Sequence, residues 1–261
     1  MNDGSDLSDM SDAERTIYTD GTYLENVSDW HAGDAPWKTA HIAALLERGG
    51  ISPSSVHDVG CGAGDVLSLL QPSLGDGTHL LGMDIAADAI RLAGEKANDR
   101  LAFVQGDYLA ADLDRPDLLL LLDVFEHVPD YLGFLTGLGD RADLFVFHIP
   151  LDLCAWGVTF RSRWMLHMRE TYGHLHYFSY ETALATLEDA GYTVLDDCFT
   201  DDYDADESMV PASGAWKQRI YYEARRRMFR LSPRHAAAVF PHFNVLVLAR
   251  RRTQERSTGD S

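Results

Sequence analysis

Short apolar runs alternate with amphipathic stretches through most of the chain. Apolar runs of about four to eight residues bounded by glycine or acids are typical of buried strands, whereas apolar residues three or four positions apart are typical of helices. Strands are predicted at "SVHDVG", "HLLGMD", "LAFVQG", "PDLLLLLD", "DLFVFHI", "GYTVLDDCF" and "FNVLVLARR". Because strands and helices alternate, we expect an α/β fold, a doubly wound and mostly parallel sheet with helices on both faces.

The helices are predicted from the same periodicity and from capping residues. One begins near Asp34, which can cap it with Pro36 in the first turn, and ends at Gly49 and Gly50. Others are expected at Asp65–Leu70 and Ala87–Asn98, in "YLGFLTGL", and at the start of "YETALATLEDAGY". These stretches lie between the predicted strands, as crossover connections require.

The segments outside this alternation set the expected domain organisation. Residues 1–15 read as an acidic disordered tail and 253–261 as a C-terminal tail, which leaves one domain over 16–252. Within it, 16–50 forms an N-terminal lid or helix. Residues 200–238 form an insert between the last two strands, with an acidic loop followed by a basic helix. We favour pairing of the acidic loop with the basic helix across a solvated surface, and the alternative is a specific binding patch.

Composition narrows the classes of function. Hydrophobic residues make up 46% of the 261 residues, which is enough for a substantial core, and the formal net charge is −19. Such a surface repels phosphate backbones, so a nucleic-acid partner is disfavoured. No apolar run is long enough for a membrane span, and the acidic N-terminus is unlike a signal peptide. The three scattered cysteines suggest no disulfide framework, so we expect a cytoplasmic protein.

The first strand-to-helix turn, "VGCGAGD", contains Gly60, Gly62 and Gly64. In an open parallel sheet, ligands bind outside the carboxyl ends of the strands, and glycine lets them approach the backbone. The dinucleotide pattern GxGxxG would place its third glycine at position 65, where Asp65 stands instead. A carboxylate at a helix N-terminus repels a diphosphate but accepts a cationic, phosphate-free adenosine. S-Adenosylmethionine has this chemistry.

Acids after the next three strands support the same ligand. Asp84 follows the last glycine by 20 residues, the spacing at which a carboxylate binds ribose hydroxyls. Asp107, in "VQGDYL", is placed for the adenine amino group, with Tyr108 or Ile85 as a flat or apolar cover. Asp123 follows the fourth strand and should lie across the crevice from the glycine turn.

Four motifs in this order, "HDVGCGAGD", "LLGMDIA", "QGDYL" and "LLDVFEHVPD", resemble those of class I S-adenosylmethionine-dependent methyltransferases. The "EHVPD" form is similar to small-molecule enzymes of the ubiquinone-biosynthesis O-methyltransferase type. The resemblance implies seven strands with the last antiparallel. It also implies Asp58 and Gly60 to Gly64 around the methionine part, Asp84 on the ribose, Asp107 on the adenine, and Asp123 or its neighbours near the tail. The full set of candidate cofactor residues is Asp58, Gly60, Cys61, Gly62, Gly64, Asp84, Ile85, Gly106, Asp107, Tyr108, Asp123, Val124 and Trp37.

Other features near this site have a structural and a functional interpretation. Asp58 lies inside a strand, and we expect it to bond the amides of the glycine turn, because an unpaired buried carboxylate is costly. Cys61 reads as a small loop residue rather than a nucleophile. Trp37, with Tyr18, Tyr23 and Trp30, either packs on the sheet or forms an aromatic lid over the sulfonium.

The acceptor's proton needs a base if the acceptor is a hydroxyl. The candidates are His127 in "FEHV", His148 at the end of the fifth strand and His174 in "YGHLHYF", with Glu126 as a residue that holds the acceptor. Two sets of metal ligands are conceivable. One is His127 with His174 and His176, and the other is His127 with Glu126 and Asp123. We favour instead that both late histidines bond backbone carbonyls and that no metal is bound.

These observations favour methyl transfer to an oxygen or nitrogen of a small organic molecule. The alternatives are a methyltransferase acting on a protein or RNA, and a module that binds S-adenosylmethionine without catalysis. A nicotinamide oxidoreductase is disfavoured by Asp65. The acceptor and the oligomeric state are not predicted.

Overall fold

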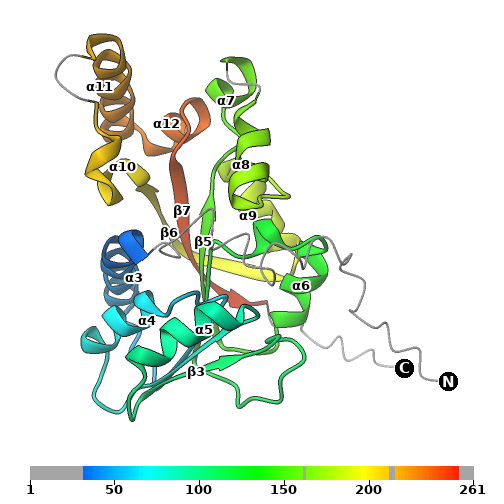
Figure 1. Ribbon diagram of the computed structural model, residues 1–261. Coiled ribbons are helices and arrows are strands. Elements are labelled where there is room, and N and C mark those ends of the chain that lie inside the picture. Colours follow the sequence, from blue (N-terminus) through cyan, green and yellow to red (C-terminus); the bar gives the residue numbers. More distant parts are fainter. Residues whose placement is uncertain (1–31, 161–162, 212–214, 253–261) are drawn as a thin grey trace, which may run out of the picture.

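The computed structural model describes residues 32–160, 163–211 and 215–252. Its centre is a seven-stranded sheet with strand order β3-β2-β1-β4-β5-β7-β6, in which β7 runs antiparallel to both neighbours and the other pairs are parallel (Figure 1). The strands are β1 (Ser55–Val59), β2 (His79–Asp84), β3 (Leu101–Gln105), β4 (Leu118–Leu122), β5 (Leu144–Pro150), β6 (Tyr192–Asp201) and β7 (Phe243–Arg251). The predicted fold class and every predicted strand are confirmed.

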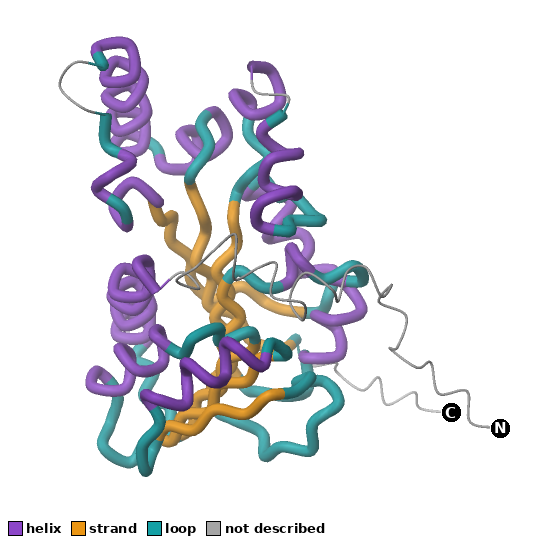
Figure 2. Tube along the Cα trace, viewed as in Figure 1, coloured by secondary structure: helices purple, strands orange, loops and turns teal. Residues whose placement is uncertain are grey.

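Helices connect the strands and cover the sheet (Figure 2). They are α3 (Ala35–Gly49), α4 (Asp65–Leu70), α5 (Ala87–Ala93), α6 (Tyr131–Leu138), α7 (Ala155–Phe160), α8 (Trp164–Tyr172), α9 (Tyr180–Asp189), α10 (Asp202–Ala205), α11 (Trp216–Leu231) and α12 (Pro233–Val239). Short 3-10 turns include η2 (Ala32–Asp34), η3 (Gln71–Ser73), η4 (Gly94–Lys96), η5 (Phe125–His127) and η6 (Glu207–Met209). The helix predicted to reach Asn98 ends as an α-helix at Ala93. The predicted cap is also wrong in detail, because the Asp34 side chain makes no capping bond to α3.

Two buried clusters form the core, built by different helices. One contains the inward faces of α3 and α4, with Ile42, Leu45 and Leu67 packed against strand residues such as Leu118. The other contains α6, α9 and α12 and includes aromatic residues of β5. The leucine run of β4 contributes alternate residues to the two clusters, because successive side chains of a strand point to opposite faces. This is why the run has no polar member.

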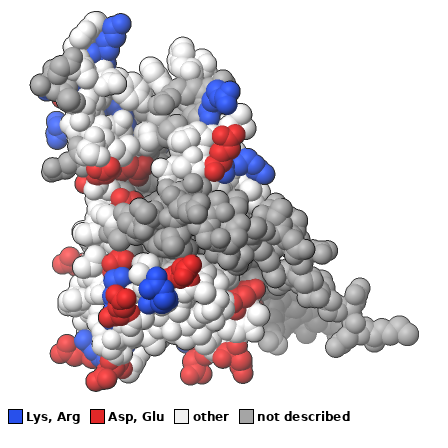
Figure 3. All heavy atoms as spheres, viewed as in Figure 1, with Lys and Arg blue, Asp and Glu red and all other residues white. Residues whose placement is uncertain are grey.

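Two additional segments stand over the carboxyl end of the sheet. In Figure 1, α7 and α8 follow β5, and α10, α11 and α12 lie between β6 and β7, above the strands. The sequence predicts a helix in the second segment but neither α7 nor α8. Among the described residues, no helix is both long and apolar enough to cross a membrane. Charged side chains of both signs are interspersed where they are visible on the face shown in Figure 3.

Candidate functional site

The turn between β1 and α4 lies between the carboxyl ends of β1 and β4, the point where the strand order changes direction. This is the place where ligands bind in open α/β sheets. Gly60 and Gly64 have positive φ angles of 72° and 79°. A Cβ atom on Gly60 would lie 2.9 Å from Val124 Cγ2, and one on Gly64 would lie 2.5 Å from the Phe103 ring. Both glycines are therefore required by the fold itself, in addition to any ligand.

Asp58 is 2% exposed, and its position corrects a prediction. The amides of Gly60 and Cys61 donate to the carbonyl oxygen of Met83, and the Gly62 amide donates to Asp84, so the turn does not depend on Asp58. Asp58 Oδ1 is buried and has no hydrogen-bond partner among the described residues. Burial, reinforced by the charge of Asp84, raises the pKa of Asp58 to about 8.

Asp84 joins the first two strand ends. Its Oδ2 accepts a hydrogen bond from the Gly62 amide at 2.9 Å, and its Oδ1 accepts one from the Ala86 amide at 2.8 Å. Burial raises the pKa of Asp84, although these backbone bonds oppose the shift. Each carboxylate oxygen has a second lone pair, so the residue can hold the loop and still accept a hydroxyl. The Gly106 amide in turn donates to the Asp84 carbonyl oxygen.

Of the residues predicted to surround adenine, two are exposed and one is buried in the core. Asp107 is exposed after β3, where its Oδ1 accepts from the Leu109 amide, and Ile85 is 41% exposed. Tyr108 is 3% exposed and lies in the core, where its hydroxyl is 2.7 Å from His57 Nδ1 on β1. The prediction of Tyr108 as an adenine cover does not fit this position, because its ring packs inside the protein. Ile85 remains open for that role.

Asp65 is paired with a lysine. Lys96 Nζ lies 3.2 Å from Asp65 Oδ2 and donates to the Ala63 carbonyl oxygen at 2.7 Å. The charge that was expected to repel a diphosphate is therefore largely offset by its neighbour. Asp65 therefore does not by itself exclude a dinucleotide.

Asp123, after β4, is held from two sides. Its Oδ2 lies 2.8 Å from Lys38 Nζ on α3, and its Oδ1 lies 2.6 Å from His148 Nδ1 on β5. Burial raises the pKa of Asp123, but the charges of His148 and Lys38 outweigh it and hold the pKa well below its usual range. Asp123 also has a φ of 56°, a strained conformation for a residue other than glycine. Both carboxylate oxygens are engaged, so Asp123 shapes this wall of the crevice.

His148 is a poor base in this arrangement. It is 3% exposed, its Nδ1 faces Asp123, and its Nε2 lies 3.0 Å from Thr200 Oγ1. Neither ring nitrogen is left to take a proton from an acceptor. The prediction of His148 as a catalytic base is therefore not supported by its geometry. Trp37 packs edge-on against His148 at 5.8 Å between ring centroids. The other residues of the predicted aromatic lid, Tyr18, Tyr23 and Trp30, lie outside the described residues.

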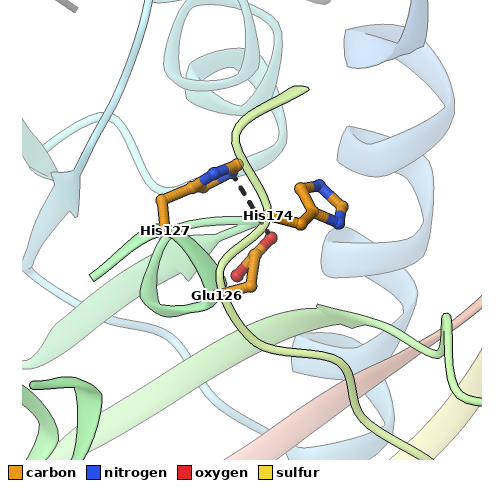
Figure 4. A group of neighbouring side chains, drawn as sticks. All are labelled: Glu126, His127 and His174. Atoms are coloured by element: carbon orange, nitrogen blue, oxygen red, sulfur yellow. Dashed lines mark ion pairs between the residues drawn. The ribbon is translucent and has the colours of Figure 1, made fainter. Parts of the chain in front are cut away.

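The remaining predicted residues gather beyond the end of β4. Glu126 and His127 lie on η5, and His174 comes from the loop after α8 (Figure 4). Glu126 is fully buried, neither carboxyl oxygen has a hydrogen-bond partner among the described residues, and His127 Nε2 lies 3.8 Å from its Oε1. The His127 and His174 rings are 5.0 Å apart. Burial, then the charge of Asp123, raises the pKa of Glu126 well above its usual range.

His174 is oriented by a residue that the sequence analysis missed. Its Nδ1 lies 2.6 Å from Oδ2 of the buried Asp152. His176 Nε2 lies 3.0 Å from the Val128 carbonyl oxygen. The prediction of carbonyl bonding is thus confirmed for His176 and wrong for His174. Asp152 follows a strand, the same signal that pointed to Asp84 and Asp123, and could have been found by it.

The buried groups of the crevice fit S-adenosylmethionine. Asp58 Oδ1, which has no hydrogen-bond partner among the described residues, lies near the end of β1 just before the glycine turn, and Asp84, with open lone pairs, accepts from the Gly62 amide of that turn. S-Adenosylmethionine offers the ammonium group of its methionine part and the hydroxyls of its ribose as partners for these oxygens. Cys61 is an unreactive neighbour, because burial raises the pKa of its thiol.

Comparison with known proteins agrees with this assignment. The profile of the methyltransferase domain family matches residues 30–197. No curated protein sequence matches the chain. Similar solved structures include a chain from the complex between the Haloferax volcanii Trm112 methyltransferase activator and a methyltransferase. It has 18% identity and a TM-score of 0.62, and covers 90% of this chain and 96% of that one.

Two further structures share the fold at low identity. Magnesium protoporphyrin IX methyltransferase from Synechocystis, with bound S-adenosylhomocysteine, has 16% identity and a TM-score of 0.58, and covers 92% of this chain and 98% of that one. The YjhP protein of E. coli has 16% identity and a TM-score of 0.60, and the match covers 89% of this chain and 100% of that one. Family match, fold and crevice chemistry together show that the chain belongs to the methyltransferase domain family, as a class I enzyme whose cofactor is S-adenosylmethionine.

Proposed function

We propose that this methyltransferase transfers the methyl group to an oxygen or nitrogen of a small organic molecule. The observation that carries the proposal is the burial of the polar cluster beyond β4. The side chains of Glu126, His127 and His174 are 0%, 14% and 12% exposed. A small molecule can reach such a depth, whereas a folded protein or an RNA helix would have to extrude a group into it. The "EHVPD" resemblance to small-molecule O-methyltransferases supports the same acceptor class.

The cofactor, when bound, supplies a methyl group already activated by its sulfonium sulfur. The protein has to bind the cofactor and the acceptor, orient them for methyl transfer, and, for a hydroxyl acceptor, remove one proton. Asp58 and the glycine turn are proposed to hold the methionine part, Asp84 the ribose, and Asp107 and Ile85 the adenine. Positioning of reactants can lower a reaction barrier by up to ~7 to 11 kcal/mol. The strained and doubly paired Asp123 supports the wall beside the acceptor.

The polar cluster is proposed to receive the acceptor's reacting atom. His174 is held in one orientation by Asp152, and Glu126 offers two oxygens that lack partners among the described residues. A hydroxyl acceptor needs its proton removed during transfer, and a positioned group that does so contributes about 10²- to 10⁴-fold to the rate. We propose that this cluster supplies the group that removes the proton.

The test is a turnover assay that measures S-adenosylhomocysteine release with a panel of small phenols, catechols, carboxylic acids and amines. Turnover with at least one small acceptor is expected, and His174→Ala should reduce it by about 10²-fold or more. The matched control is His79→Ala, an exposed histidine at the opposite edge of the sheet, which should keep full activity. Methylation of RNA or protein with no small acceptor used would overturn the proposal. So would cofactor binding without any turnover.

A further inference from the structure

Glu126, His127 and His174 lie close together on two separate segments, and the His127 ring faces the Glu126 carboxyl (Figure 4). Each offers one ligand atom, and these three atoms all lie within 4.8 Å of one another. Neighbouring ligands around a tetrahedral zinc ion are ~3.4 Å apart, given bond lengths of about 2.0 to 2.2 Å. The 3.8 Å between Glu126 Oε1 and His127 Nε2 is already close to this spacing.

The Glu126 carboxyl is the group of this cluster that most needs a partner. It is fully buried, and both its oxygens lack a hydrogen-bond partner among the described residues. Buried polar groups without partners are rare in folded proteins, because each costs about 1 to 3 kcal/mol or more. Two such oxygens on one side chain, with ligand atoms of two imidazoles within 4.8 Å, indicate that a partner belongs there. A cation satisfies the carboxylate and the imidazoles together.

His174 has the support that a metal-binding histidine usually has. Its Nδ1 faces the Asp152 carboxylate at 2.6 Å, which leaves Nε2 for another ligand. Ligating histidines typically use their second ring nitrogen for a carboxylate or carbonyl in this way. Two nearby candidates are unavailable. His176 Nε2 is committed to the Val128 carbonyl oxygen, and Asp123 is paired with Lys38 and His148.

We propose that Glu126, His127 and His174 bind a divalent transition metal ion, with Asp152 as the residue that positions His174. Two imidazoles and one carboxylate form a ligand set suited to zinc, and iron or manganese are the next candidates. Three protein ligands leave a coordination position open, which is typical of catalytic rather than structural sites.

The open position explains how the acceptor would be activated, and this part rests on the proposed function. A metal-bound hydroxyl loses its proton far more easily, as bound water does when zinc lowers its pKa from about 15.7 to about 7. The acceptor's proton leaves to solvent water, and an oxygen electron pair forms the new bond to the methyl carbon. The methyl–sulfur bond breaks, and its electron pair stays on sulfur. No oxidant or reductant is needed.

The test measures metal binding to the full chain directly, without reference to turnover. Chelator-treated protein is titrated with Zn²⁺ by calorimetry and with Co²⁺ by visible absorption, which reports the ligand geometry. One tight site is expected in the wild type. Glu126→Gln, which keeps the shape of the side chain, and His174→Ala should abolish it. Asp152→Asn should weaken it by about 10- to 100-fold.

The control is His79→Ala, which should bind both ions as the wild type does. Retention of the thermal shift produced by S-adenosylhomocysteine shows that each variant is folded. The proposal is overturned if the wild type has no tight site, or if Glu126→Gln and His174→Ala bind as tightly as His79→Ala. Turnover without a metal site would refute this inference alone, whereas a metal site without turnover would refute only the proposed function.

Discussion

At the residue scale, the least expected feature is the Asp58 carboxyl. It lies at the end of a buried strand, where water is excluded and Oδ1 has no protein partner among the described residues. Burial and the nearby charges of Asp84 raise its pKa to about 8, and Lys38 only partly opposes the shift. A group in this state costs folding stability at neutral pH. That cost is explained if the carboxyl is kept for a ligand.

Asp58→Asn should therefore change how stability depends on pH. In the folded state the carboxyl keeps its proton until about pH 8, whereas its ordinary pKa is 3.8. The unfolded chain thus releases the proton first, and stability falls as pH rises between these values, by at most about 1.4 kcal/mol per pH unit. Urea unfolding of both proteins from pH 4 to 8 measures this.

The expected result is that the free energy of unfolding of the wild type, minus that of Asp58→Asn, declines steadily across this window. The asparagine cannot ionise, so the subtraction removes the contribution of all other groups. Curves that run parallel over the whole range would show that Asp58 is ionised in the folded protein.

At the scale of elements, α11 is attached to the sheet by one buried ion pair. Arg225 is fully buried, its two terminal nitrogens bind the Asp201 carboxylate at 2.6 and 2.7 Å, and its guanidinium lies between the rings of Tyr203 and Phe243. It also donates to the His242 carbonyl oxygen. The sequence predicts pairing of this insert's acidic and basic residues across a solvated surface, whereas the pair formed by Asp201 and Arg225 is buried.

Replacing Arg225 by Met should lower the free energy of unfolding by about 3 to 5 kcal/mol, because it leaves the Asp201 carboxylate buried and unpaired. Arg226→Met, at the exposed neighbouring position, should change it by less than about 0.5 kcal/mol. Adding Asp201→Asn to Arg225→Met should recover part of the loss. Denaturant unfolding followed by circular dichroism measures all three. Equal stability of the Arg225 and Arg226 variants would contradict the anchoring role.

At the scale of the whole molecule, binding of the cofactor product should stabilise the folded chain. S-Adenosylhomocysteine at 100 times its dissociation constant adds about 2.7 kcal/mol, which raises the melting temperature by several degrees in a protein of this size. NAD should produce no shift. The pairing of Asp65 with Lys96 means that this selectivity comes from the crevice as a whole. Asp65→Asn is therefore expected to retain it, and differential scanning fluorimetry checks both ligands.

Replacing Asp84 by alanine would not isolate a contact between its carboxylate and the ribose. Asp84 also holds the Gly62 and Ala86 amides, so its loss would loosen the turn even without a role in binding. The wild type is instead tested with S-adenosylhomocysteine and with its analogue that lacks the 2′-hydroxyl. The difference between the two increases in melting temperature reports the ribose contact without a mutation. Equal shifts would exclude a bond from Asp84 to that hydroxyl.

The sequence by itself determined the strands, their order of alternation and the motif positions, because these follow from local periodicity and from glycines and acids at strand ends. Leu118–Leu122 is apolar throughout since both its faces are covered, and that pattern is visible without a structure. The candidate cofactor residues were found for the same reason, as parallel strands bring their carboxyl ends to one edge.

Only the tertiary structure decided which partners these side chains have. His148 could not be distinguished from a base until Asp123 and Thr200 were found at its two nitrogens, and Asp65 looked unpaired until Lys96 was placed beside it. The link from His174 to Asp152 likewise joins residues 22 positions apart. The physical reason is that burial and charge pairing depend on distances between segments remote in sequence, whereas periodicity reports only neighbours along the chain.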